Sequence, residues 1–215
     1  ASVSHGEQTG ALFLGLVLHL GGACVLRLVT LATSVRAWES RHLDMALAAP
    51  LPRWAFHGGR AAGFALLAWA FPLLWLPAAV WSSSWSLAWP WALALGCEYT
   101  LVSAAGLLFA TALGRMVPAF IATALWYVTA QSLDEIRTLA QGSFAAAAPL
   151  LHAWRDLPDW LGWFFPALDR FASAGWLVHP ELANNMAWPW LGGETAVFTL
   201  LLTVAGLYDF QRRNL

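Results

Sequence analysis

Residues 87–113 read LAWPWALALGCEYTLVSAAGLLFATAL, and this stretch decides the fold. It contains a single charged residue, Glu98, among long runs of alanine, leucine and aromatic residues. A helix needs about 20 mostly apolar residues to cross the hydrocarbon core of a bilayer. The stretch therefore predicts a membrane-spanning helix that carries one carboxyl group near its middle.

The rest of the chain has the same character. Of its 215 residues 60% are hydrophobic and 11% are charged, against about 45–50% and about 25% in soluble domains. A folded chain of this size cannot hide so much apolar surface from water. The fold class we expect is all-α, a polytopic membrane helix bundle forming one transmembrane domain over residues 1–215. Its five spans are expected at about 11–35, 61–81, 87–113, 116–133 and 194–211.

Arginine positions predict the orientation of these spans. Five spans place alternate loops on opposite sides, and seven arginines then share one side: Arg36, Arg41, Arg53, Arg60, Arg115, Arg212 and Arg213. The other side has three, Arg137, Arg155 and Arg170. Because cytoplasmic loops carry the excess of basic residues, we expect the N-terminus outside and the C-terminus in the cytoplasm. Ten of the fifteen tryptophans then fall in or beside the outer loops, as interfacial rings should.

Composition and motifs also exclude several classes of function. The net charge is −1 and lysine is absent, so the basic field that nucleic-acid binding requires is missing. Neither Cys24 nor Cys97 has a Cys or His neighbour at ligand spacing, which argues against a zinc site or a disulfide framework. No phosphate-binding loop occurs. We expect no metal, no cofactor and no enzymatic activity in this chain alone.

Two regions are too polar or too short to span. Residues 36–60 read RAWESRHLDMALAAPLPRWAFHGGR, with a short helix predicted at 37–49 and stopped by Pro50 and Pro52. On the other side, short amphipathic helices are predicted within 134–190, where DWLGWFFPALDRFASAGWL (159–177) alternates large rings with charges. Such helices lie in the membrane interface.

The order of these parts resembles the permease subunits of type-2 ABC transporters. The resemblance is carried by a descending span, by a short helix with Glu39, Leu43, Asp44 and Leu47, and by Pro50, Arg53 and Gly59 before a rising span. FPALDRF at 165–171 and the terminal YDFQRRNL also look like this family. Arg41 and His42 stand where the family usually has Gly and Thr.

The resemblance implies a membrane half-transporter of a bacterial cytoplasmic (inner) membrane. Family members usually have six spans, so the five here would be the second to sixth, with the first absent from this chain. The implied partners are a second permease protomer, as a homo- or heterodimer, membrane lipid and a cytoplasmic ATPase that binds ATP and Mg²⁺. The helix at 37–49 would be the coupling helix, with contact residues Trp38, Glu39, Arg41, Leu43, Asp44, Leu47 and Arg53.

Three polar residues inside the spans have two interpretations each. Glu98 is either a carboxylate of a substrate cavity or proton-linked step, or a protonated or hydrogen-bonded acid at a helix–helix or dimer seam. Arg27 either snorkels toward the cytoplasmic headgroups or pairs with Glu98. His19 has no second histidine facing it within a span, so a hydrogen-bonded core residue is favoured over a haem ligand.

The outer aromatic residues Trp160, Trp163 and Phe164, next to Asp169, either anchor the interface or form a gate for a lipid-like substrate. The function we expect is therefore that of an ABC permease subunit. The alternatives are a non-transporting membrane anchor or scaffold of an enzyme complex, and a redox subunit. Neither the substrate nor the direction of transport follows from these residues.

Overall fold

A computed structural model describes residues 5–39, 52–141, 157–171, 174–179, 181 and 188–212. Every element in these ranges is helical. In chain order they are α1 (His5–Glu39), α3 (Arg53–Ser82), α4 (Trp85–Leu113), α5 (Met116–Gln131), α6 (Leu133–Gln141), α9 (Leu157–Phe164), the 3₁₀ turns η2 (Leu168–Arg170) and η3 (Ala174–Leu177), and α11 (Trp188–Arg212).

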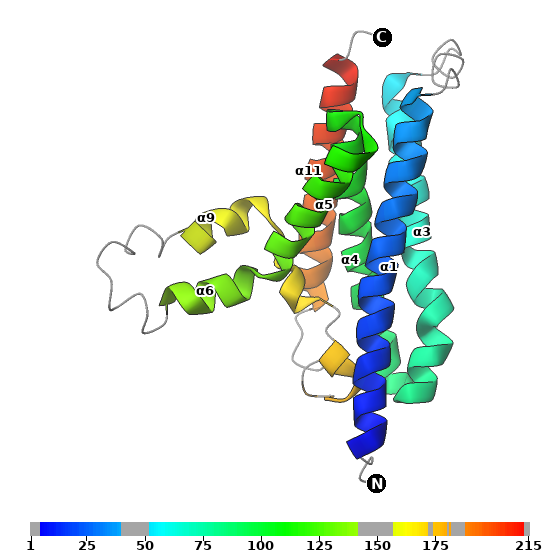
Figure 1. Cartoon of the computed structure of the whole chain (residues 1–215), viewed down its shortest axis with the longest axis vertical. Helices are drawn as coiled ribbons and strands as arrows, with labels where there is room; N and C mark the ends of the chain where they lie inside the picture. Colours follow the sequence, from blue (N-terminus) through cyan, green and yellow to red (C-terminus); the bar gives the residue numbers. More distant parts are fainter. Residues whose placement is uncertain are drawn as a thin grey trace.

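Four of these helices are long and apolar enough to cross a membrane: α1, α3, α4 and α11. They run side by side along the long axis of the molecule (Figure 1). Their lipid-facing surfaces are covered by large apolar side chains, such as Phe13, Leu66, Leu74 and Leu200, each more than half exposed. Outside a bilayer that surface would be in water, so the arrangement is that of an integral membrane helix bundle.

The central helix of the bundle is α4. Of its most apolar segment 78% is buried, against 33% or less in α1, α3 and α11. All three, together with α5, pack against it. Its sequence explains why, because alanine and glycine recur through it and let neighbouring backbones approach closely. At Gly96, for example, an added Cβ would come within 2.7 Å of the Trp69 ring of α3.

Tight turns fix the directions of the helices. Ser83 caps α3 through its backbone N–H, which donates to the Ala79 carbonyl at 3.0 Å, and α4 begins two residues later. Gly114 ends α4 with φ 64°, and its N–H donates to the Ala110 carbonyl. This left-handed conformation favours glycine. The ends of α1, α4 and α11 consequently lie at one end of the bundle with the start of α3 (Figure 1).

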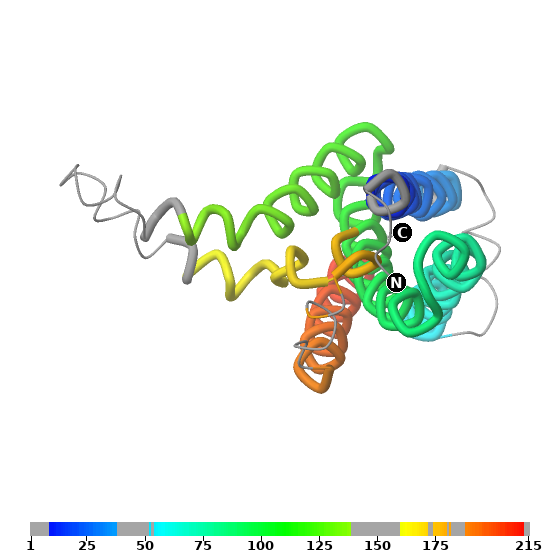
Figure 2. The backbone as a smooth tube through the Cα atoms, turned by 90° about the horizontal axis from the view of Figure 1, so that it is seen from below, coloured from blue at the N-terminus to red at the C-terminus, as the bar shows by residue number. Residues whose placement is uncertain are grey.

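The expected fourth span, at about 116–133, is shorter than predicted. Helix α5 has 16 residues, or about 24 Å at 1.5 Å per residue, less than the roughly 30 Å of a hydrocarbon core. It ends at Gln131, and α6 begins at Leu133 in a new direction. Seen along the bundle axis, α6 and α9 project away from the other helices (Figure 2). We call α6 and α9 the arm.

The predicted helix at 37–49 is only partly covered by the described residues. Helix α1 continues without a break through residues 36–39 and ends at Glu39. The remainder, including Arg41, Leu43, Asp44 and Leu47, lies outside the described residues. Trp38, Glu39 and Arg53 lie at helix ends, but their side chains are also outside the description. The coupling helix therefore stays a prediction.

Candidate intramembrane polar site

Glu98 lies at the centre of the bundle. It is 0% exposed and stands 13 residues after the start of α4 and 15 before its end. At 1.5 Å per residue it is about 20 Å from either end of the helix. A carboxyl group at this depth is costly unless neighbouring groups satisfy it.

Three side chains from two other helices donate to one oxygen of Glu98. His19 Nε2 of α1 is 2.7 Å from Glu98 Oε1. From α5, the Tyr127 hydroxyl donates to the same oxygen at 2.9 Å and the Gln131 amide at 3.1 Å. Glu98 therefore joins α1 and α5 to α4 at a single atom.

Tyr99, the next residue of α4, adds a second link to α1. Its hydroxyl lies 2.9 Å from the His19 carbonyl and 3.0 Å from the Leu18 carbonyl, and it donates to them. On its other side its ring packs edge-on against Trp75 of α3. Gly22 of α1 makes this packing fit, because an added Cβ there would overlap both the Trp75 ring and the Tyr99 hydroxyl.

Arg27 lies next to this cluster but does not form an ion pair with Glu98. Its guanidinium carbon stands 4.3 Å from the centroid of the Tyr127 ring, a cation–π contact. The residue is 8% exposed, and its Nε atom has no hydrogen-bond partner among the described residues. Tyr127 thus contacts the carboxyl with its hydroxyl and the cation with its ring face.

The hydrogen bonds to Glu98 distinguish its two oxygens. The acceptor is Oε1 of Glu98 in every case, so this oxygen faces His19, Tyr127 and Gln131, while Oε2 has no partner among the described residues. Arg27 supplies a positive charge on the other side of Tyr127. The group comprises Glu98, Arg27, His19, Tyr99, Tyr127 and Gln131. We call these six residues the intramembrane polar site.

The structure decides between the sequence interpretations in part. Glu98 is a hydrogen-bonded acid at a helix seam, and His19 is a hydrogen-bonded core residue whose partner is that acid. Tyr127, Tyr99 and Gln131 were not predicted. A usable signal existed for two of them, because Tyr127 and Gln131 are four residues apart and so share one face of an otherwise apolar helix.

A second group of charges lies beside the arm. Glu194 near the start of α11 accepts the backbone N–H of Ala167 at 2.9 Å, which holds the FPALDRF segment onto the bundle. Burial raises the pKa of Asp169, and neighbouring Asp134 adds to the rise, while Arg170 and Arg137 oppose it. The Arg170 guanidinium stands 5.2 Å from the Trp190 ring centroid. The predicted outer aromatics Trp160, Trp163 and Phe164 are on α9 and are 68–80% exposed.

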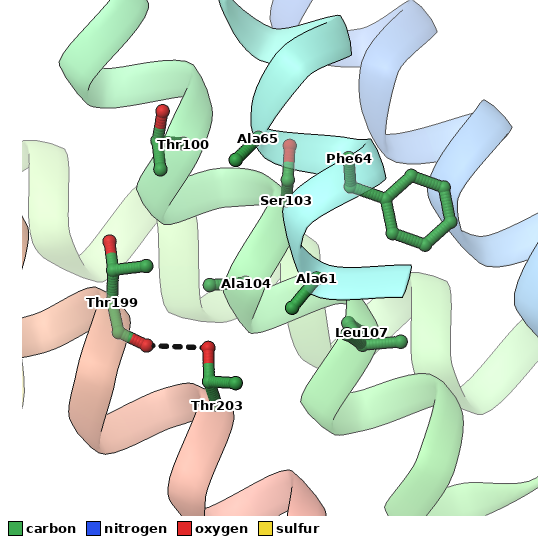
Figure 3. Close-up of a pocket in the computed structure, with 9 residues that line it drawn as sticks. All are labelled: Ala61, Phe64, Ala65, Thr100, Ser103, Ala104, Leu107, Thr199 and Thr203. Carbon is green, nitrogen blue, oxygen red and sulfur yellow. Dashed lines mark hydrogen bonds between the residues drawn. The ribbon is translucent and has the colours of Figure 1, made fainter. Parts of the chain in front are cut away.

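The cavities between α3, α4 and α11 involve other residues. One, of about 10 Å³, is lined by Thr100, Ser103, Thr199 and Thr203 with apolar neighbours, and Figure 3 shows it from the side. A wider groove of about 560 Å³ lies alongside, between Trp69, Cys97 and the threonines of α11. Neither is lined by Glu98, His19 or Tyr127. Within the described ranges, no three His, Cys, Asp or Glu side chains are grouped to hold a metal ion.

Comparisons with known proteins give no relative from which to transfer a role. No family model, no curated protein and no solved structure matches the chain.

Proposed function

We propose that this chain is the membrane-spanning permease subunit of an ATP-driven ABC transporter in a bacterial cytoplasmic membrane. Its spans would be moved by a partner ATPase and would pair with a second permease protomer to pass a substrate. The observation that carries the proposal is the placement of α1 and α3. Both pack on the central helix α4, and they meet the C-terminal end of α11 at the same end of the bundle (Figure 1).

With this placement, a partner that moves one end of the bundle would move α1 and α3 together. A partner that binds residues 37–49 would hold the end of α1 and the start of α3 together. Because both helices contact α4 along the bundle, displacement of that end would be passed to the membrane-spanning core as helix shifts. Arg36, Arg115 and Arg212 lie near the same end, so the basic residues favour a cytoplasmic position for it.

The test replaces Leu43 and Leu47 with glutamate in the full chain and purifies the complex from the native membrane. The control is the same charge change at His42 and Ala46, which are not assigned to the contact. We expect an ATPase with a phosphate-binding loop to co-purify at one copy per permease with the wild type and the control, and to be lost with L43E/L47E. Retention of the ATPase by L43E/L47E would contradict the coupling role.

Orientation is tested separately, by placing single cysteines in a background without Cys24 and Cys97. A cysteine at Asn214 should react with a membrane-impermeant thiol reagent only in inside-out vesicles. A cysteine at Ser84, in the turn between α3 and α4, should react only from the outside of intact cells. The opposite pattern would place the basic end outside, where a cytoplasmic ATPase has no access.

A non-transporting anchor or scaffold is the second candidate. The observation in its favour is that three hydrogen bonds already engage Glu98, which lines neither of the two cavities between α3, α4 and α11. That candidate predicts that an enzyme without a phosphate-binding loop co-purifies in place of the ATPase.

A further inference from the structure

A row of buried polar atoms leads from the intramembrane polar site toward the end of the bundle where α1 ends. On α1, Thr30 and Ser34 follow Arg27 at spacings of three and seven residues, and therefore lie on one side of the helix. Both are 0% exposed. Their hydroxyl oxygens have no hydrogen-bond partner among the described residues. Such groups inside a membrane bundle are normally satisfied by a neighbour or by ordered water.

The row continues onto α3. Ser34 lines a cavity of about 10 Å³ together with His57, Arg60 and Thr111. His57 is 2% exposed, and its Nε2 atom also has no hydrogen-bond partner in the part of the chain that the structure describes. The lining also includes Phe56, Leu107 and Phe210, and a volume of about 10 Å³ is close to the smallest that holds one water molecule. Arg60 is partly exposed and stands over the rings of Phe56 and Phe64 at the outer side of the cavity.

The spacing along α1 fits a chain of waters. At 1.5 Å per residue, the distance along the helix axis is about 4.5 Å from Arg27 to Thr30 and about 6 Å from Thr30 to Ser34. These steps are too long for direct hydrogen bonds and short enough for one or two bridging waters each. Thr30 faces Gly106 of α4, where an added Cβ would come within 3.3 Å of its methyl group.

At the inner end of the row, Glu98 presents an acceptor that nothing uses. Its Oε2 atom is buried and has no partner among the described residues, whereas Oε1 receives all three donors. A proton bound at Oε2 would leave the donors on Oε1 in place. Carboxyl and histidine side chains inside membrane bundles are the groups that relay protons.

We propose that Glu98 and His19 form a proton-binding site at mid-membrane depth, reached from the end of α1 through water held by Thr30, Ser34 and His57. Hydronium at that end gives up one proton and becomes water. The proton passes along the hydrogen-bonded row and binds Oε2 of Glu98, converting the carboxylate to a carboxylic acid. No other bond is made or broken.

Charged and titratable groups face this site from each neighbouring helix. Helix α1 contributes His19 and Arg27, with Cys24 close to Arg27; α4 contributes Tyr99, and α5 contributes Tyr127. From α3 the neighbour is the uncharged ring of Trp75, while His57 and Arg60 face the row nearer its end. Asp169, Arg170 and Glu194, on η2 and α11, interact with one another beside the arm. Protonation of Glu98 leaves the charge of Arg27 uncompensated, so the site gains one positive charge.

The test is infrared difference spectroscopy of the purified full chain in lipid nanodiscs, comparing neutral with mildly acidic buffer. Burial also raises the pKa of Asp169, and Glu194 interacts with Asp169 and is itself half-buried, so both are replaced in a D169N/E194Q background. We expect the carbonyl stretch of a buried carboxylic acid to appear on acidification in the wild type and in this background, and to be missing when E98Q is added to the background. If E98Q does not fold, Y127F serves instead, because removal of one hydrogen bond to Oε1 must shift the frequency of the same band. A band that persists when E98Q is added to the background, does not move in Y127F, or never appears in the wild type or in the background would overturn the site.

The path is tested by the rate at which this band rises after a rapid drop in pH. Thr30→Val and Ser34→Ala remove the hydroxyls and keep the volumes close to those of the original side chains. The control is Thr123→Val, whose buried hydroxyl on α5 already donates to the Ala119 carbonyl. We expect the rise to slow several-fold in T30V and S34A and to be unchanged in T123V. Equal rates in all three would overturn the path. The measurement needs no ATPase, so its result is independent of the proposed transport function.

Discussion

Two carboxyl groups in this protein differ in the number of hydrogen bonds that they accept and in the parts of the fold that they connect. Glu98 is fully buried, and donors from α1 and α5 converge on one of its oxygens. Glu194 is half-buried and accepts one backbone N–H, that of Ala167. The first joins three helices inside the membrane, and the second fastens one surface segment. Removing a buried carboxyl leaves its hydrogen-bond donors without an acceptor, and each such donor lowers the stability of the bundle.

Replacing Glu98 with alanine should have the largest effect. It leaves the donors of His19, Tyr127 and Gln131 without their acceptor and Arg27 without a compensating charge, which we expect to cost about 3–5 kcal/mol. The matched change is E194A, where one backbone donor loses its partner near the surface and about 1 kcal/mol is lost. Unfolding free energies measured in lipid bicelles compare the two. Equal losses of unfolding free energy would mean that the hydrogen bonds to Glu98 stabilise the fold no more than the single bond to Glu194.

Glycine at position 22 should matter more than glycine at position 21. An alanine methyl at position 22 would overlap Trp75 and Tyr99, whereas nothing lies within 4 Å of the same methyl at position 21. We expect G22A to cost about 1–3 kcal/mol through overpacking. G21A should be neutral or stabilising by up to about 1 kcal/mol, since alanine favours a helix over glycine. A stable G22A would show that α1 packs on α3 and α4 differently from the structure.

Gln131→Leu should have a smaller effect. It removes one of three donors to Glu98 and leaves the other two, so the expected loss is about 0.6 kcal/mol, the average for interhelical hydrogen bonds in membranes. The loss should be local. Hydrogen exchange should quicken at the end of α5 and leave α4 unchanged, with Q141L at the end of α6 as the control.

Replacing Asp169 with asparagine should have the smallest effect on stability, and this effect should depend on pH. Because its pKa in the folded state is raised by burial and by Asp134, the folded protein binds more protons than the unfolded chain between the ordinary aspartate pKa and the raised value. Stability therefore falls as pH rises through that window. D169N removes the penalty and should increase hydrogen-exchange protection of residues 165–171 at neutral pH by a small factor. Acidification should protect this segment in the wild type and not in D169N, after correction for the intrinsic exchange rate.

The sequence predicts the bundle well and the polar site less well. Long apolar runs such as 87–113 predict spanning helices because the thickness of the bilayer sets the length of a span. The structure has α4 at Trp85–Leu113. The span expected at about 116–133 is observed as α5, which ends at Gln131, and this residue donates a hydrogen bond to Glu98. Local pattern does not contain this interhelical contact.

Within the site, Glu98, His19 and Arg27 stand out in the sequence because charge and imidazole are rare in apolar runs. Their partners do not, because tyrosine is common in membrane helices and pairing depends on how helices are rotated against one another. The sequence left open whether Arg27 meets Glu98. In the structure the face of the Tyr127 ring contacts Arg27, and the Tyr127 hydroxyl contacts Glu98. Residue spacing along one helix does not predict this arrangement.

The most direct test of the account is a double-mutant cycle between Glu98→Gln and Tyr127→Phe, with unfolding free energies measured in bicelles. The account predicts that the two substitutions are not additive, with a coupling energy between about 0.6 and 1.7 kcal/mol, the range for interhelical hydrogen bonds in membranes. Additivity within about 0.3 kcal/mol would contradict the claim that Glu98 joins α5 to the centre of the bundle.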